Sequence, residues 1–109
     1  MSSLQRDVDR YVTEAGGYFG ELTNLARLLE EAGEIAAIYA RTRGELKPKA
    51  TDDVSAAALE SEMGDLLFVL CCLANQAGID LDRALLGSIA KFRHRDKGRH
   101  SHLQEGSEA

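Results

Sequence analysis

Apolar residues recur at intervals of three and four positions through most of this chain, the period of amphipathic helices. The pattern predicts a first helix over about residues 4–15, which the pair Gly16-Gly17 interrupts. The period returns at residue 22 and continues to about residue 43, where Gly44 is expected to cap the end of a second helix. The first half of the chain therefore reads as two helices joined by a glycine-containing turn.

The second half also contains two predicted helices. They follow a polar connection over residues 45–54, which contains the only proline. A third helix is predicted from about residue 55 to residue 77, with Asp53 or Ser55 as its N-cap and Gly78 as its stop. Asp80 can cap a fourth helix. No alternation typical of strands occurs, so we expect an all-α domain over residues 1–96, a four-helix bundle, followed by a charged tail without fixed structure over residues 97–109.

One stretch of the third helix, residues 66–74, is apolar on every side, which is typical of a helix that is covered all round. Four helices of one short chain can hardly enclose one of their own number. We therefore expect a second copy of the chain to complete the bundle as a homodimer, and a homotetramer is the alternative. Met63 and the leucines near it are expected in the core.

The charge and the cysteine content limit the partners that we expect and indicate a cellular compartment. Thirteen Lys and Arg against eighteen Asp and Glu give a net charge of −5, which argues against a nucleic-acid partner. The adjacent Cys71 and Cys72 point apart on a helix and cannot readily bond to each other, so a reduced, cytoplasmic protein is expected. The longest apolar run is far shorter than the roughly 20 residues of a membrane span, so no membrane partner is expected.

Acidic residues occupy unusual positions on the second and third helices. On a helical projection of about 100° per residue, Glu31 falls at the margin of the apolar stripe and Glu62 falls among apolar positions of the third helix. Glu34 and Asp65 follow these two residues at the i+3 positions, on the same side of each helix. If the two helices pack together, four carboxylates converge, and oxygen-only ligands favour Mg²⁺, Mn²⁺ or Ca²⁺.

A simpler interpretation is a solvated acidic face, which is common on exposed helices. Two i, i+3 acid pairs, one of them in apolar surroundings, favour the metal site over that interpretation. The absence of histidine near the four acids argues against a di-iron bundle, which uses a Glu-x-x-His pair.

At this point three segments resemble a known family. They are the E-E-x-x-E motif of residues 30–34, the E-x-x-D motif of residues 62–65 and the Lys-Phe-x-x-Arg pattern of residues 91–95. Together they resemble the MazG-like, all-α nucleotide pyrophosphohydrolase superfamily, in its short, single-domain, YpjD-type branch. The resemblance covers nearly the whole chain, from about residue 5 to residue 100, and it implies a MazG-like helical bundle.

The resemblance also implies an activity and assigns roles to residues. It implies Mg²⁺-dependent hydrolysis of a nucleoside triphosphate between the α- and β-phosphates, with Mn²⁺ as a possible substitute, and a role in clearing unwanted nucleotides from the cellular pool. The implied site residues are the metal ligands Glu31, Glu34, Glu62 and Asp65, the catalytic pair Glu30 and Glu31, and the substrate-binding residues Lys91, Arg95 and Asn75.

Two other functions stay open from the sequence. The first is a non-catalytic helical dimerisation or adaptor domain, although all five motif acids are present. The second keeps the fold and the metal but acts on phosphoribosyl-ATP. The preferred base and sugar do not follow from the sequence, because pocket walls determine them.

Overall fold

The computed structural model describes residues 1–44 and 53–97, and these residues form helices and connections with no strand among them. The helices are α1 (Ser3–Glu14), α2 (Glu21–Thr42), α3 (Ala56–Ala77) and α4 (Leu81–Arg95). All four predicted helices are therefore confirmed, with ends that differ from the predicted ones by at most one residue. Most of the predicted connection at residues 45–54 and the predicted tail from residue 98 onward lie outside the described residues.

Local chemistry sets the helix ends. Ser55 caps α3 through its side-chain oxygen, which accepts a hydrogen bond from the Ala58 backbone N–H at 3.1 Å. Asp80 does the same for α4, accepting from the Arg83 N–H at 3.1 Å. At the other end of α3, Gly78 adopts a left-handed conformation with φ of 69°, which other residues adopt only with strain. These three caps match the sequence-based predictions.

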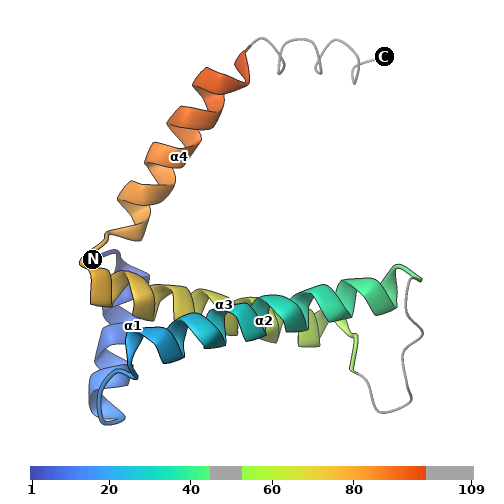
Figure 1. The fold of residues 1–109 in the computed structure, drawn as a ribbon, viewed down its shortest axis with the longest axis horizontal. Helices are drawn as coiled ribbons and strands as arrows, with labels where there is room; N and C mark the ends of the chain where they lie inside the picture. The colour runs from blue at the N-terminus through green and yellow to red at the C-terminus, as the bar shows by residue number, and fades with distance from the viewer. Residues whose placement is uncertain (45–52, 98–109) are drawn as a thin grey trace.

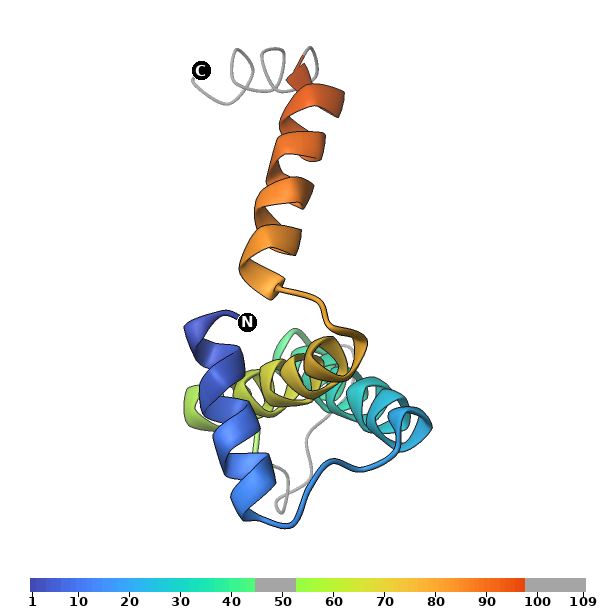
Figure 2. The same ribbon diagram turned by 90° about the vertical axis from the view of Figure 1, so that its left-hand side faces the viewer.

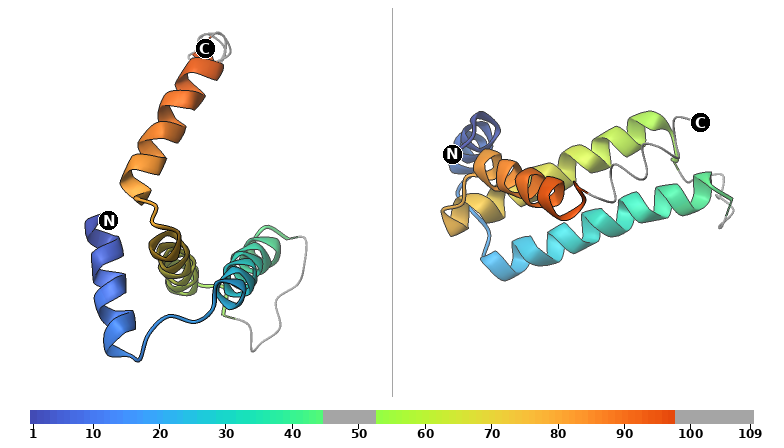
Figure 3. Two further views of the ribbon diagram at one scale, coloured as in Figure 1. Left: turned by 60° about the vertical axis from the view of Figure 1, so that its left-hand side comes forward. Right: turned by 90° about the horizontal axis from the view of Figure 1, so that it is seen from above.

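The helices α2 and α3 lie side by side and run in opposite directions (Figure 1, and from above in Figure 3). The helix α1 packs across α3 near the end of α3 that leads into α4 (Figure 2). The buried apolar side chains are small and come mainly from the second half of α3; they are Val12, Ile38, Val69, Cys71, Cys72 and Ala74. The core is therefore a narrow seam along α3.

The fourth helix departs from the predicted bundle. In Figure 1 it projects away from the layer of α2 and α3, and none of its residues is buried. Its apolar side chains are exposed, including Leu85 at 61% and Leu86 at 67%. A helix with an apolar face can bury it against its own chain or against another one, so a helical pattern alone does not fix where α4 lies.

The expected burial of the residues around the acids was also wrong for the single chain. Met63 is 44% exposed, Leu67 is 44% exposed and Leu29 is 67% exposed. The described helices of one chain cover α3 on the sides that face α1 and α2 only. None of these helices combines the length and the apolar character that crossing a membrane would require.

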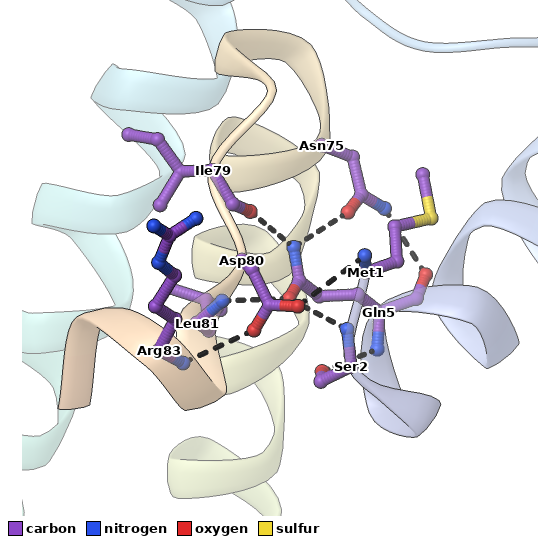
Figure 4. A network of polar contacts seen from close by, with 8 residues as sticks. All are labelled: Met1, Ser2, Gln5, Asn75, Ile79, Asp80, Leu81 and Arg83. Atoms are coloured by element: carbon purple, nitrogen blue, oxygen red, sulfur yellow. Dashed lines mark hydrogen bonds and ion pairs between the residues drawn. The ribbon is translucent and has the colours of Figure 1, made fainter. Parts of the chain in front are cut away.

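A polar junction joins α1 to the connection between α3 and α4 (Figure 4). Gln5 is fully buried, and its Nε2 donates to Asn75 Oδ1 at 2.9 Å and to the Ile79 carbonyl at 2.7 Å. Its Oε1 accepts from the Leu81 N–H at 2.8 Å and from the Ser2 N–H at 3.1 Å. One glutamine therefore fixes the start of α4 relative to α1 and α3.

Candidate metal centre

Three carboxylates meet where α2 and α3 pack against each other. Glu31 comes from α2, while Glu62 and Asp65 stand three residues apart on one face of α3. One carboxylate oxygen from each residue lies within 4.8 Å of those of the other two. Glu31 and Glu62 are half-buried, and Asp65 is exposed. The predicted convergence of acids from two helices is therefore present for these three residues.

One oxygen of this group has no partner within the chain. Glu62 Oε2 is buried and makes no hydrogen bond. A buried carboxylate oxygen without a partner is costly, and such groups in folded proteins usually have a hydrogen bond, a counter-charge or a bound ion. The buried oxygen of Glu62 therefore lacks a donor or counter-charge, and a bound ligand could supply one.

The crowding of the acids changes the protonation of Glu31. A hydrogen bond to Glu62, burial, and the negative charges of Glu62, Asp65 and Glu30 raise the pKa of Glu31 from 4.5 to about 7. Each of these causes disfavours the charged form in the metal-free chain. A divalent cation would act in the opposite direction, because carboxylates must be deprotonated to bind a metal.

The donor set fits a hard divalent cation. Three carboxylates supply only oxygen ligands, which suit Mg²⁺, Mn²⁺ or Ca²⁺ better than metals that prefer nitrogen or sulfur. Both the orphaned oxygen of Glu62 and the like charges around Glu31 are features that such an ion would relieve.

The other predicted acids lie at the edge of this group. Glu34, the predicted fourth ligand, is exposed and is not among the three residues whose oxygens meet. Glu30 is exposed and acts on the group through its charge, which helps to raise the pKa of Glu31. The roles of both residues stay predictions.

The cationic residues predicted to bind phosphate lie on α4, which projects away from α2 and α3 (Figure 1). Lys91 and Arg95 both lie over the Phe92 ring, with their charged groups 5.3 Å and 4.9 Å from its centre. Arg95 also pairs with Asp96 at 2.9 Å. One chain alone thus does not bring these two residues to the acids.

Asn75, predicted to contact sugar or base, is engaged in the polar junction. Its Nδ2 donates to the Gln5 carbonyl at 3.1 Å and to the Tyr18 hydroxyl at 2.9 Å, and its Oδ1 accepts from Gln5. Contact with a substrate would require exchange of these bonds, so the arrangement favours a structural role.

Sequence reasoning missed two buried amides, Gln5 and Asn24. Ser2 and Gln5 form a capping box, a signal that is readable in the sequence. Asn24 carried no such signal, since its partner at 3.0 Å, Gln76 on α3, is brought to it by the tertiary fold.

Comparison with known proteins gives consistent matches. Residues 19–100 match the MazG nucleotide pyrophosphohydrolase domain. The uncharacterized protein YpjD of Bacillus subtilis is 44% identical over 107 residues, which cover 97% of this chain and 95% of that protein. The dCTP pyrophosphatase 1 of Rattus norvegicus is 33% identical over 84 residues, 76% of this chain, and the match spans about half (48%) of that protein.

Solved structures match as well. The crystal structure of YPJD from Bacillus subtilis superposes with a TM-score of 0.71 at 44% identity, covering 82% of this chain and 90% of that one. A Bacillus-conserved MazG protein, described as a nucleotide pyrophosphohydrolase, gives a TM-score of 0.68 at 38% identity, covering 87% and 90%. The matched residues 19–100 include α2 and α3, the helices that carry the acids.

Proposed function

Because this chain belongs to the MazG nucleotide pyrophosphohydrolase family and is a nucleotide pyrophosphohydrolase, we propose that it cleaves nucleoside triphosphates between the α- and β-phosphates. The products are a nucleoside monophosphate and pyrophosphate. The observation that carries this proposal is the meeting of Glu31, Glu62 and Asp65 around a buried, unpartnered carboxylate oxygen. Such a group suits the binding of a metal that accompanies a triphosphate.

Glu31, Glu62 and Asp65 would hold Mg²⁺, with Mn²⁺ as a substitute and Glu34 as an additional ligand. A bound divalent ion neutralises phosphate charge and lowers the pKa of a coordinated water. The acids therefore serve first to hold and orient. Their positions on two packed helices keep the oxygens in place without a mobile loop.

The attacking group is a water molecule in this proposal. One of the two adjacent acids, Glu30 or Glu31, accepts a proton from that water as its oxygen bonds to the α-phosphorus. The bond from this phosphorus to the oxygen that bridges to the β-phosphate breaks, and pyrophosphate leaves with that oxygen. This chemistry needs no covalent intermediate on the protein.

A second copy of the chain completes the site in this proposal. The exposed apolar side of α4 includes Leu85, Leu86 and Phe92, and a helix of this kind is stable when another surface covers it. In a homodimer or homotetramer, α4 of one copy could bring Lys91 and Arg95 toward the acids of another. Sedimentation equilibrium measures the state, and a monomer at all concentrations would contradict this part.

The same proposal assigns the enzyme to the cytoplasm and to the removal of unwanted nucleotides from the pool. The direct test is a screen for pyrophosphate release with Mg²⁺ across ribo- and deoxynucleoside triphosphates. The screen includes dCTP, because a relative is a dCTP pyrophosphatase, and phosphoribosyl-ATP. We expect monophosphate and pyrophosphate from at least one nucleoside triphosphate and loss of activity on chelation. Release of orthophosphate instead, or no product from any of them, would overturn the proposal.

A further inference from the structure

One short turn joins α4 to the rest of the described chain. Packing between the described helices is concentrated at two pairs, α2 with α3 and α1 with α3. No residue of α4 is buried, and the helix projects from the layer of α2 and α3 (Figure 1). Only residues 78–80 separate the end of α3 from the start of α4. The direction of α4 within one chain is therefore decided at this turn.

Asp80 is the residue about which the turn can rotate. The residue before it, Ile79, is tied to α3 through its backbone N–H, which donates to the Ala74 carbonyl at 2.9 Å. Asp80 itself has φ of −87° and ψ of 115° and directly precedes α4. Because peptide groups are planar, these two angles set the orientation of the peptide group after Asp80 relative to the one before it. A change in either angle would swing the whole of α4.

The side-chain amide of Gln5 holds both of these peptide groups (Figure 4). The Ile79 carbonyl belongs to the group before Asp80 and accepts from Gln5 Nε2 at 2.7 Å. The Leu81 N–H belongs to the group after Asp80 and donates to Gln5 Oε1 at 2.8 Å. Rotation of one group relative to the other would break one of the two bonds. Since Gln5 is 0% exposed, breaking such a bond leaves a buried polar group unpaired, which is costly.

Two further bonds fix the amide itself. Gln5 Oε1 also accepts from the Ser2 N–H at 3.1 Å, and Nε2 also donates to Asn75 Oδ1 at 2.9 Å. An amide side chain has two N–H donors and two acceptor sites, so all of them are in use. A buried apolar residue could pack α1 against α3, but it could not hold the turn. The chemistry of Gln5 therefore indicates a task beyond packing.

A small change at the turn becomes large at the far end of α4. At 1.5 Å per residue, Lys91 and Arg95 lie about 15 Å and 21 Å beyond Leu81 along the helix. A swing of about 20° at Asp80 would displace them by roughly 5–7 Å. Such a displacement exceeds the reach of a hydrogen bond, which is about 3 Å between heavy atoms. Cations on this helix can meet a fixed group of phosphates only if the turn is held.

We propose that Gln5 is a positioning residue, which fixes the direction of α4 and thereby brings Lys91 and Arg95 to the triphosphate. This inference rests on the proposed function, because that function gives the two cations their ligand. Loss of the Gln5 bonds should weaken triphosphate binding and leave the acids able to turn over the substrate that is bound. A residue that only stabilises the fold would change neither property in a folded chain.

The first experiment measures the direction of α4 without any substrate. Nitroxide labels on Ala57→Cys in α3 and Ala90→Cys in α4, both exposed positions, report their separation by double electron–electron resonance. The native Cys71 and Cys72 are buried, so the introduced thiols react first. Dilution with unlabelled chain ensures that each distance belongs to one molecule. We expect a narrow distance distribution in the parent chain and a broader one in Gln5→Leu.

A second variant leaves Gln5 in place. Leu81→Pro removes the N–H that Gln5 binds, at the first residue of α4, where proline is well tolerated. The extended conformation of Asp80 also suits the residue before a proline. Its distance distribution should likewise differ from that of the parent. Ile38→Ala is the matched control, because it removes a buried side chain of α2 far from the turn and should lower stability while the distribution stays narrow.

The second experiment separates binding from turnover. At a temperature where urea unfolding shows each variant to be folded, Gln5→Leu should raise KM for the triphosphate about tenfold and leave kcat within about twofold. In a chain that carries both Lys91→Ala and Arg95→Ala, the same change should raise KM no further, because the groups that Gln5 positions are gone. Ile38→Ala should leave KM unchanged.

Three results would overturn the inference. They are a distance distribution that Gln5→Leu leaves unchanged, an unchanged KM in that variant, and an equal rise of KM in the chain that lacks both cations. A broader distribution without pyrophosphate release from any triphosphate would reject the proposed function and keep the orienting role of Gln5. Pyrophosphate release with an unchanged distribution would do the reverse.

Discussion

Two regions of this molecule bury polar atoms, and they treat them in opposite ways. At the junction of α1 with α3 and α4, Gln5 is fully buried and both ends of its amide are hydrogen-bonded (Figure 4). At the crossing of α2 with α3, Glu62 has a buried oxygen without any partner and two further acids nearby. The first region is complete within one chain, and the second is not.

This difference separates groups that hold the fold from groups that await a ligand. A buried polar network stabilises a protein only when its members are satisfied, as they are around Gln5. Clustered acids with an orphaned oxygen destabilise the chain by itself, and natural proteins retain such features mainly at functional sites. Substitutions in the two regions should therefore affect different properties, stability at the junction and turnover at the acids.

The largest expected effect is on turnover. Glu62→Gln removes one charged ligand and should lower the rate of pyrophosphate release by at least roughly 100-fold, because the acid group would lose a ligand for its metal. The fold should persist, since the change also removes one of three like charges. Glu60→Gln is the matched control, as Glu60 is exposed on the same helix. Normal turnover in the Glu62 variant would contradict the assignment.

The next effect is on stability at the junction. Gln5→Leu keeps a similar volume but leaves Asn75 Oδ1, the Ile79 carbonyl and the Leu81 N–H without their hydrogen bonds to the Gln5 side chain. We expect a loss of about 2–4 kcal/mol in the free energy of unfolding, measured with urea. Arg6→Leu, at an exposed neighbouring position, should change it by less than about 0.5 kcal/mol. Equal losses in both variants would show that the junction is not special.

Metal addition should stabilise the folded chain, and only by binding at the three acids. Mg²⁺ or Mn²⁺ at 100 times its dissociation constant should add about 2.7 kcal/mol, seen as a higher melting temperature. The response should shrink in Glu62→Gln and stay unchanged in Gln5→Leu, provided that each melts cooperatively. Potassium chloride at matched ionic strength controls for screening. A melting temperature that neither Mg²⁺ nor Mn²⁺ changes would contradict the proposed metal site.

A smaller loss is expected at the outer part of the junction. The Tyr18 hydroxyl donates to Asp9 Oδ1 at 2.7 Å and accepts from Asn75 at 2.9 Å. Tyr18→Phe should lower the free energy of unfolding by about 1 kcal/mol, because Asn75 keeps its bonds to Gln5. Urea unfolding measures this, and a loss as large as that of Gln5→Leu would indicate that Tyr18 is equally central.

The last effect is the pH dependence of the metal-free chain. The pKa of Glu31 is raised to about 7 in the fold, against 4.5 for the free side chain. Between these values the folded chain holds a proton that the unfolded chain has released, so stability is full below about pH 4.5 and falls as pH rises through 7. Thermal melting from pH 4.5 to 8 should show this slope, and Glu31→Gln should reduce it. An identical slope in the two proteins would mean that Glu31 does not produce it.

The parts of the fold that the sequence predicts are those set by neighbouring residues. The caps Ser55, Gly78 and Asp80 act within one helical turn, so helix ends could be placed from the pattern. The direction of α4 depends instead on which apolar surface covers it, and no local signal specifies that surface. The four-helix composition was predictable for this reason, while the packing of the fourth helix was not.

The candidate site also has features that local spacing predicts and features that only the tertiary fold determines. The i, i+3 spacing puts Glu62 and Asp65 on one face of α3, and the apolar margin around Glu31 predicted its approach to them. Glu34 is not in this group, because membership depends on how far a side chain lies from the line of contact between α2 and α3. The burial of Asn24 depends on Gln76, which lies 52 residues away in the chain. Neither property is encoded in a short stretch of sequence.

The antiparallel course of α2 and α3 has a consequence for how this protein can change over evolutionary time. An inserted residue between Arg27 and Glu31 would turn the carboxylate by about 100° and advance it by about 1.5 Å, away from its partners on the opposing helix. Exchanges of one amino acid for another at positions 28 and 29 would leave that alignment intact. Homologous chains should therefore differ in the amino acids at these positions, while the number of residues between Arg27 and Glu31 stays constant.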